Sequence, residues 1–393
     1  MPATRLVFYA CAAVLVRTAD EGGRVALILL ALDRFDHAGT TGLLVACLMI
    51  PHVVAAPVVG ALTDWSARPA LAIGALTLGF SASLALTALT LGSLPRSASL
   101  LVLLLGGSCG PALTGGLSSQ VSRLAGPTSL PRAFGLDALT YNIAGVAGPA
   151  LTALAASLAG STAACLLMAG ISAAGASVAA ALPVRRSVVD AGRRRPSLTA
   201  GARAIAGDRT LATVIVASSV GQLGPGAVPV VVALAATAHQ RPSAAGLMMS
   251  AIAVGAVLGS LLWTARPAPA AHAPVVFMVA MCGTGLSIVA CAVTTSLVTL
   301  TVALAVSGLF LGPLVSALFT ARDALAPPEV RAQVFTIGAG LKITAAATGT
   351  AAVGLLSGAP IAVQFLVIGL NPVVTGLIGL AVLGPIRSIR MRR

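Results

Sequence analysis

The sequence predicts an all-α membrane protein, in which twelve transmembrane helices form two six-helix bundles related by a parallel duplication. Hydrophobic residues make up 58% of the 393 positions and charged residues 9%, and the mean hydropathy of +1.01 exceeds that of soluble globular domains. Apolar runs long enough to cross a hydrocarbon core of roughly 30 Å recur along the chain. Two nearly identical hexapeptides, WSARPA at 65–70 and WTARPA at 263–268, lie 198 residues apart.

The apolar runs predict helices and not a transmembrane barrel. A barrel needs short alternating strands flanked by aromatic girdles, whereas aromatic residues are only 3% of this chain. Runs divided at proline, glycine and charge clusters give twelve predicted spans: 6–32, 41–63, 70–92, 97–121, 133–157, 161–182, 210–236, 244–263, 273–293, 297–319, 333–356 and 361–386.

The duplication extends beyond the tryptophan hexapeptides. Gly110-Pro111 corresponds to Gly312-Pro313, and Arg123 to Arg322, at offsets close to 200 residues. Two copies of six spans each must share one orientation in the bilayer. We therefore expect an N-terminal bundle at 1–182 and a C-terminal bundle with a basic tail at 210–393, joined by a basic linker with room for a short surface helix at 183–209.

The distribution of arginine predicts the orientation. With the N-terminus inside, eighteen arginines fall on cytoplasmic segments, and only Arg34, Arg96 and Arg241 fall outside. Such a bias is expected of a multi-pass protein of the inner (plasma) membrane with both termini cytoplasmic. Orientation thus accounts for the net charge of +14, and a nucleic-acid partner is not expected.

Neither the cysteines nor the polar residues indicate an enzyme. All six cysteines fall inside predicted spans at unpaired spacings, which favours small buried apolar residues over disulfides or metal ligands. The chain shows no spacing typical of a Ser/His/Asp triad, a Cys/His pair or a metal site. We expect no enzymatic activity, no metal and no cofactor.

Four charges interrupt the first span. At 100° per residue, Arg17, Asp20, Glu21 and Arg24 share one helical stripe. Because a charge facing lipid costs about 2.5–3.5 kcal/mol, the stripe must face protein or a water-filled cavity. One interpretation is a structural lattice of i,i+4 ion pairs, Arg17 with Glu21 and Asp20 with Arg24.

The alternative is a transport site, which we favour because buried ion pairs are seldom the best source of stability. Asp20 or Glu21 would take up and release a proton, and the two arginines would act as counter-ions or substrate anchors. Adjacent acids titrate as a coupled pair, so the sequence selects neither of them. Gly22 and Gly23, which follow directly, allow a neighbouring helix to approach closely.

The single lysine of the sequence, Lys342, lies inside the span 333–356 on a stripe of small residues. It either extends its side chain to the membrane interface or serves as a cavity cation. As a cavity cation, it would pair with Asp20 or Glu21 in one state and with an anionic substrate or solvent in another.

Two motifs resemble the major facilitator superfamily, and the duplicated organisation with a basic central loop resembles it over the whole chain. The stretch from Gly60 to Arg68, GALTDWSAR, is similar to the cytoplasmic loop motif of that family. The resemblance implies two bundles that rock about a central cavity lined by the first span. It also implies a latch, in which Asp64 sits at a neighbouring helix N-terminus and Arg68 bridges to an acid, for which Asp137 is the nearest plausible partner.

The second motif is GVAGP in the fifth span, with Gly145, Gly148 and Pro149, which resembles the glycine-proline motif of exporters in that superfamily. Proline removes a backbone hydrogen bond and glycine admits a close neighbour, so this motif should bend or tightly pack the span.

Several polar residues are candidate cavity ligands. Gln222 begins a stretch of the seventh span, QLGPGAVP, that has too many helix breakers for a straight helix. Tyr141 and Asn142 could bind substrate, with core packing as the alternative. His52 follows a proline and is either a titrating ligand or a satisfied structural histidine.

Together these features predict a monomeric secondary transporter that exports small amphipathic compounds, such as drugs or natural products, in exchange for protons. One alternative is an importer or facilitator of an anionic metabolite, drawn by Arg17, Arg24 and Lys342. Another is a membrane sensor or scaffold without transport activity.

Overall fold

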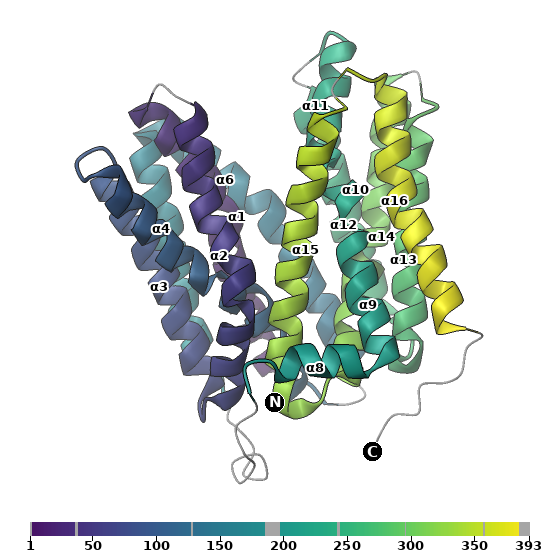
Figure 1. Ribbon diagram of the computed structural model, residues 1–393, viewed down its shortest axis with the longest axis horizontal. Helices are drawn as coiled ribbons and strands as arrows, with labels where there is room; N and C mark the ends of the chain where they lie inside the picture. Colours follow the sequence, from purple (N-terminus) through teal and green to yellow (C-terminus); the bar gives the residue numbers. More distant parts are fainter. Residues whose placement is uncertain are drawn as a thin grey trace. The chain divides into compact units, whose positions relative to one another are not determined.

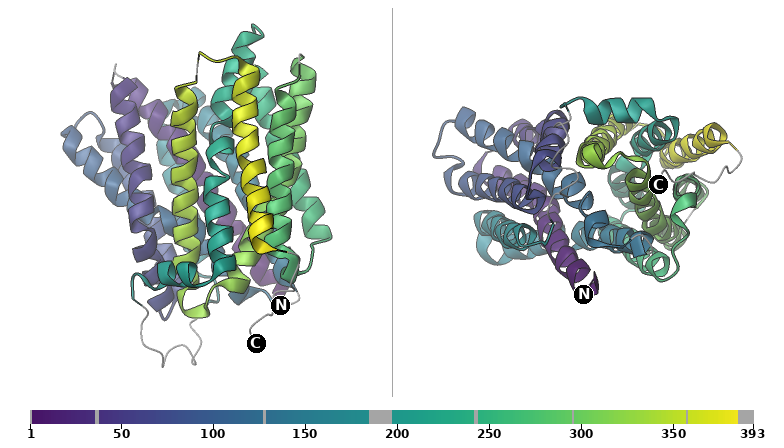
Figure 2. Two further views of the ribbon diagram at one scale, coloured as in Figure 1. Left: turned by 45° about the vertical axis from the view of Figure 1, so that its right-hand side comes forward. Right: turned by 90° about the horizontal axis from the view of Figure 1, so that it is seen from below.

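The computed structural model describes residues 2–35, 38–126, 129–184, 197–241, 244–294, 296–356 and 358–384. Within these ranges the chain forms helices and no strands, as predicted. The chain divides into two compact units, each of which includes a segment from the other half of the sequence. Figures 1 and 2 show the helices of each unit running side by side as a bundle.

Unit 1 comprises Met1–Gly126, Ile143–Ala204 and Pro327–Gly340. Its described elements are α1 (Pro2–Arg34), α2 (Ala38–Trp65), α3 (Pro69–Thr90), α4 (Arg96–Pro111), the π-helix η1 (Ala112–Gly116), α5 (Val121–Leu124), most of α6 (Leu130–Ala180), the start of α8 (Ala200–Gly207), η4 (Pro328–Val330) and the first turns of α15 (Arg331–Gly354).

Unit 2 comprises Pro127–Asn142, Ile205–Ala326 and Leu341–Arg393. Its described elements are the first turns of α6, α9 (Arg209–Val220), α10 (Leu223–Gly226), α11 (Val228–Ala238), α12 (Ala244–Ala265), η3 (Ala270–His272), α13 (Ala273–Cys291), α14 (Leu297–Leu325), the remainder of α15 and α16 (Ile361–Leu383).

The described residues contain nine helical segments long and apolar enough to cross a membrane. One of these segments, Leu130–Ala180, contains Gly160 at φ +87° and therefore comprises two of the predicted spans. Two further long helices fall outside the nine: α1, whose apolar run carries four charges, and α15, which is rich in alanine, glycine and threonine. The count of twelve spans stays a prediction.

The predicted linker contains α8, the expected short helix, while residues 185–196 lie outside the described part of the chain. The basic tail predicted at the C-terminus also lies outside it, from 385 onward.

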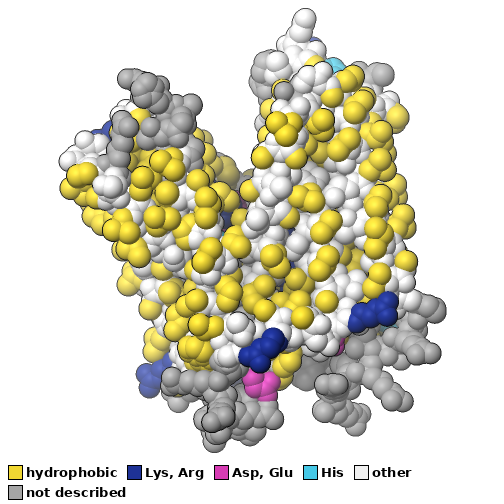
Figure 3. Space-filling view, in the orientation of Figure 1, with side chains coloured by type: hydrophobic (Ala, Val, Ile, Leu, Met, Phe, Trp, Pro, Cys, Tyr) yellow, Lys and Arg dark blue, Asp and Glu magenta, His cyan; other side chains and the backbone are white. Residues whose placement is uncertain are grey.

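Apolar side chains fill the interior of each unit and also cover its outer faces. Leu27, Phe80 and Leu84 belong to a buried cluster in unit 1, and Leu304 and Phe365 to one in unit 2. Figure 3 shows hydrophobic side chains over the long sides of the helices, as expected of surfaces that contact lipid. All six cysteines are free, as predicted, but only Cys165 and Cys291 are buried; Cys11 is exposed, and Cys47, Cys109 and Cys282 are partly exposed.

The seventh predicted span is broken at its glycines and proline, as expected, into α9, α10 and α11. Inside a membrane, the backbone groups released by such a break need new partners. The Gly224 N–H donates to Asn371 Oδ1 at 3.0 Å, and the Gly226 carbonyl accepts from Thr350 Oγ1 at 2.8 Å. Residues of α15 and α16 thus stabilise the break.

In unit 1, α1 and α6 approach closely at two glycines. A Cβ atom added to Gly148 would lie 2.7 Å from the Gly22 nitrogen and 2.8 Å from the Thr18 carbonyl oxygen. The Thr152 hydroxyl donates to the Gly22 carbonyl at 3.0 Å across the same contact. Gly145, three residues earlier, would meet nothing within 4 Å. The close approach expected of Gly22 and Gly148 is therefore present, and Gly145 has no part in it.

This difference predicts opposite effects of two matched substitutions. Gly148→Ala should destabilise the protein by about 1–3 kcal/mol, because the backbone of α1 must move away from the new methyl group. Gly145→Ala should be neutral or slightly stabilising, since alanine favours a helix over glycine by about 1 kcal/mol. The fraction of detergent-solubilised protein that stays folded after heating measures both, and equal melting curves for the two variants would contradict the packing described here.

Candidate functional site

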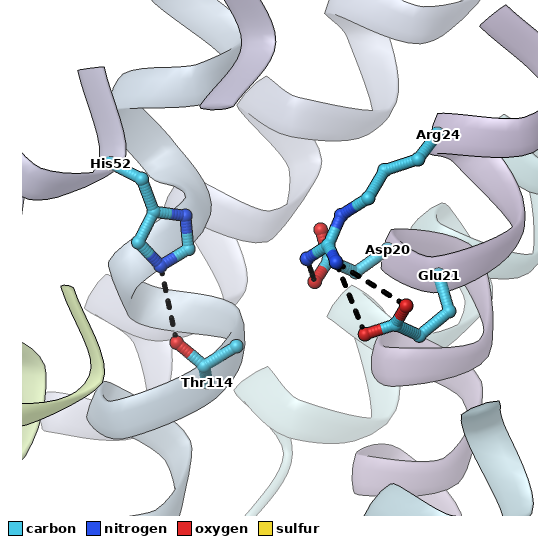
Figure 4. A network of polar contacts seen from close by, with 5 residues as sticks. All are labelled: Asp20, Glu21, Arg24, His52 and Thr114. Carbon is cyan, nitrogen blue, oxygen red and sulfur yellow. Dashed lines mark hydrogen bonds and ion pairs between the residues drawn. The ribbon is translucent and has the colours of Figure 1, made fainter. Parts of the chain in front are cut away.

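The α1 charge cluster consists of Arg17, Asp20, Glu21 and Arg24, all within unit 1. Arg24 Nη2 lies 2.5 Å from Asp20 Oδ2, and Arg24 Nη1 lies 3.3 Å from both oxygens of Glu21 (Figure 4). One guanidinium therefore bridges two adjacent carboxylates. The fork of donors on arginine suits such a double contact.

Arg17 takes a different partner from the one expected of the lattice. Its Nη2 donates to Ser118 Oγ at 2.9 Å and to the Tyr9 hydroxyl at 3.4 Å, while Glu21 pairs with Arg24 at i,i+3. Of the two expected i,i+4 pairs, only Asp20 with Arg24 forms as predicted. The physical reason is that Ser118, just before α5, offers the buried Arg17 side chain an acceptor from another helix.

The two carboxylates differ in their access to solvent. The Glu21 side chain is 39% exposed and that of Asp20 is 7% exposed, with Arg24 at 22%. Asp20 is thus held in the interior by the shorter ion pair, and the Glu21 side chain is partly exposed. Proton exchange with water is therefore more accessible to Glu21, a distinction that the sequence did not make.

His52 lies on α2 in the same unit, with Arg24 as an electrostatic neighbour (Figure 4). Its Nε2 is 3.4 Å from the Thr114 hydroxyl, and its ring packs against the backbone of Gly110, where any side chain would overlap it. The residue is buried. These contacts favour the structural interpretation of His52 over the ligand interpretation.

Asp64 is the acceptor at the N-terminus of α15, within unit 1. Its Oδ1 accepts from the Ala332 N–H and its Oδ2 from the Gln333 N–H, both at 3.0 Å. A Cβ atom on Gly60 would lie 2.5 Å from the Gln333 Cα, so the motif glycine permits this approach. A carboxylate here satisfies two free N–H groups and favourably meets the positive end of the helix dipole.

The other two latch residues lie in different units. Arg68 is exposed at the start of α3 in unit 1. Asp137 is buried on α6 in unit 2, and its backbone carbonyl accepts from the Thr140 hydroxyl. Their pairing stays a prediction.

In unit 2, Lys342 and Gln222 line one cavity of about 190 Å³, which we call the unit 2 cavity. Apolar side chains dominate its wall, including Phe277, Met281 and Leu314. The structure therefore brings together two residues that the sequence singled out separately. Lys342 thus lines a cavity of unit 2, whereas its pairing with Asp20 or Glu21 stays a prediction.

Tyr141 and Asn142 lie at the end of the α6 segment in unit 2 and make packing contacts. Asn142 Nδ2 donates to the Ala256 carbonyl at 3.1 Å and to Ser260 Oγ at 2.8 Å. The ring of Tyr141 lies 5.7 Å from that of Phe319, centroid to centroid. Both residues attach α6 to neighbouring helices, which favours the core-packing interpretation.

Sequence reasoning missed Arg322 as a site residue, because it lies just beyond the predicted span 297–319 and was assigned to a cytoplasmic segment. In the structure, α14 continues to Leu325 and Arg322 is buried. Its Nη2 donates to Ser218 Oγ on α9 at 3.0 Å. The spacing of four residues from Leu318 to Arg322, on an apolar stripe, was the available signal.

Comparison with known proteins identifies the family. The model of the Major Facilitator Superfamily matches residues 10–224, more than half of the chain. The chain belongs to the Major Facilitator Superfamily. A curated member, the uncharacterized MFS-type transporter y4rN of Sinorhizobium fredii, is 25% identical over 384 residues, which cover 94% of this chain and 93% of that one.

Solved superfamily structures share the fold. A bacterial homologue of the iron transporter ferroportin matches with a TM-score of 0.74 at 14% identity, covering 96% of this chain and 98% of the other. The Escherichia coli fucose:proton symporter matches with 0.74 at 14%, covering 95% and 97%. The human organic anion transporter MFSD10 matches with 0.71 at 16%, covering 97% and 100%.

Membership in the superfamily makes this protein a multi-pass membrane transporter of small molecules and not an enzyme, and it confirms the all-α membrane fold. The names of the three solved proteins give iron, fucose and organic anions as substrates. Since one fold serves all three, the substrate of this superfamily member must be sought in its own side chains.

Removal of the Asp64 carboxylate should loosen the first turn of α15. Asp64→Ala should destabilise that turn by about 0.5–2 kcal/mol, the usual effect of losing a helix cap, and accelerate hydrogen exchange at the Ala332 and Gln333 amides. Asp208→Ala is the matched control, because Asp208 caps α9 through the Leu211 N–H at 2.8 Å. Unchanged exchange at Ala332 and Gln333 in Asp64→Ala would refute the cap.

Proposed function

We propose that this superfamily member exports small amphipathic compounds by proton-coupled alternating access, with the α1 charge cluster as its coupling group. The observation that carries the proposal is the sharing of Arg24 by a buried Asp20 and an exposed Glu21. A purely structural lattice would gain little from leaving one of its carboxylates partly exposed.

The charges suggest how a proton would act. With both acids ionised, Arg24 neutralises one of the two negative charges. Protonation of Glu21 removes the second negative charge and leaves Asp20 and Arg24 as a neutral pair at 2.5 Å. The proton thus changes the net charge of the Asp20, Glu21 and Arg24 group from −1 to 0, while Arg17 keeps its own charge beside Ser118. This change alters the cost of moving that part of α1 between water and a drier environment.

We propose export as the direction because the glycine-proline motif of α6 resembles that of exporters in the superfamily. A Cβ atom on Gly148 would lie 3.0 Å from the Glu21 Cβ, so the motif packs directly beside the proposed coupling residue. Any change in the bend of α6 near Pro149 would therefore act on the backbone that carries Glu21.

The gating latch, the monomeric state, the membrane topology and the bundle boundaries are proposed as the sequence predicts them. The Asp64 cap of α15 would open and reform during the cycle, together with Arg68 and Asp137. The transporter would work as a monomer in the inner (plasma) membrane with both termini cytoplasmic, and its bundles would span 1–182 and 210–393 around the linker 183–209.

A second candidate, transport of an anionic metabolite, has one specific observation in its favour. Lys342 lines the unit 2 cavity, and no carboxylate is among the lining residues. A cation in that setting favours an anionic ligand.

Neutralisation of the cluster tests proton coupling. In proteoliposomes with an imposed proton gradient, Glu21→Gln and Asp20→Asn should reduce gradient-driven dye or antibiotic transport to background, because neither amide can exchange a proton. Asp33→Asn, an exposed acid on the same helix, is the matched control and should transport normally.

Substrate-dependent flux without any gradient should survive in Glu21→Gln, because the path for substrate would remain. Gradient-driven transport at the wild-type rate in both Glu21→Gln and Asp20→Asn would remove the coupling assignment. Loss of activity in Lys342→Gln alone would instead support the anionic substrate.

A further inference from the structure

We propose that the unit 2 cavity binds an organic anion, with Arg322 and Lys342 holding its negative group and the apolar wall enclosing the rest of the molecule. The inference deepens the proposed function. It rests on that function in one respect, that substrate occupies this cavity. It assigns a residue, Arg322, that lay outside the predicted site.

The position of Arg322 follows from the stripe that lines the cavity. Leu311, Leu314 and Leu318 of α14 belong to the cavity wall, and Arg322 continues their stripe one turn further. Its guanidinium donates at 3.0 Å to the hydroxyl of Ser218, which is itself a lining residue. Arg322 is not itself a lining residue, and Ser218 connects its guanidinium to the cavity wall.

No carboxylate offsets this charge among the described contacts. The Arg322 side chain, 1% exposed, bonds through Nη2 to the neutral Ser218, and its buried Nε has no hydrogen-bond partner in the described part of the chain. A buried guanidinium with an unused donor is costly, because the charge has lost water without gaining a counter-charge. An anion within reach would supply the missing counter-charge.

Lys342 adds a second positive charge to the same region. Lys342 lines the cavity and Arg322 is its electrostatic neighbour, so two positive charges lie near each other in this part of unit 2. Two neighbouring cations, without a carboxylate in the cavity wall, predict that a ligand with at least one negative charge binds more tightly than a neutral one of the same shape. The partly buried arginine of the α1 charge cluster in unit 1 differs from Arg322, because Arg24 already pairs with Asp20 and Glu21.

The rest of the wall indicates the shape of the ligand. Side chains such as Phe277, Met281 and Ile288 make the wall largely apolar, and Gln222 and Thr284 add a few neutral hydrogen-bonding groups. A cavity of about 190 Å³ is somewhat larger than the roughly 150 Å³ apolar cavity that holds a benzene molecule, so it suits a compact body of one or two rings. These features point to an aromatic or short aliphatic monocarboxylate.

Binding to the purified full-length protein tests this site. The probes are 2-naphthoate and its neutral analogue 2-naphthamide, titrated calorimetrically in detergent without a proton gradient. We expect saturable naphthoate binding that weakens roughly ten- to hundredfold in Arg322→Gln and in Lys342→Gln, the usual effect of losing a hydrogen bond to a charged group. Naphthamide should bind more weakly than naphthoate and respond little to either substitution.

Two variants separate the site from general effects of charge and folding. Arg322→Lys retains the positive charge and should keep most of the naphthoate affinity. Arg266→Gln removes an exposed arginine of unit 2 and should bind like the wild type. Should Arg322→Gln fail to fold, Lys342→Gln and Ser218→Ala test the same cavity.

Equal affinities for naphthoate and naphthamide in the wild type would overturn the proposal, as would naphthoate binding that is unchanged in folded Lys342→Gln and Arg322→Gln. Because the measurement needs no gradient and no flux, failure of proton coupling would leave the binding result intact. A protein that binds naphthoate as expected but transports nothing would refute the proposed function and keep the anion site.

Discussion

Every charge placed among these apolar helices costs free energy, and this cost constrains how the helices pack. An isolated charge in a membrane span costs about 2.5–3.5 kcal/mol even on the lenient scale, so each one needs a partner or an aqueous surface. Arg24 forms ion pairs with two carboxylates, and Asp64 accepts hydrogen bonds from two N–H groups in the first turn of α15. Arg17 and Arg322 each have a serine hydroxyl. These partners connect helices that are distant in sequence.

The duplicated halves meet this constraint in two chemically different ways. In unit 1, an arginine on the first helix, Arg17, donates to Ser118 near the end of the fourth predicted span. In unit 2 the residue types are exchanged: Ser218 lies on the first helix of the repeat, α9, and Arg322 on its fourth, α14. The two acids of the α1 charge cluster, Asp20 and Glu21, lie in unit 1, while the unit 2 cavity is lined by Lys342 and by no carboxylate. The two units therefore differ in how the charges among their helices are paired.

Close helix packing makes these polar contacts possible. Gly22 and Gly148 bring α1 against α6 beside Glu21, and Gly60 brings α2 against the start of α15 beside Asp64. In each case the absence of a side chain lets a neighbouring backbone come near enough for hydrogen bonds. Solved transporters with different named substrates share this fold at 14–16% identity. Chemical differences must therefore reside in the side chains that these similar helices carry.

The helical membrane class, the duplication, the break in the seventh span and the stripe of four charges could all be predicted from the sequence. Hydropathy and helical periodicity are local properties of the chain, which is why they can be read without a structure. The hydrogen-bond and ion-pair partners of the charged side chains became known only from the packing of the helices. In the structure, Arg17 donates to Ser118 and Asp64 caps α15. Glu21 is more exposed than Asp20, and Arg322 is buried. Contacts between helices distant in sequence, and the solvent that reaches each side chain, depend on how the helices pack, which no local pattern encodes.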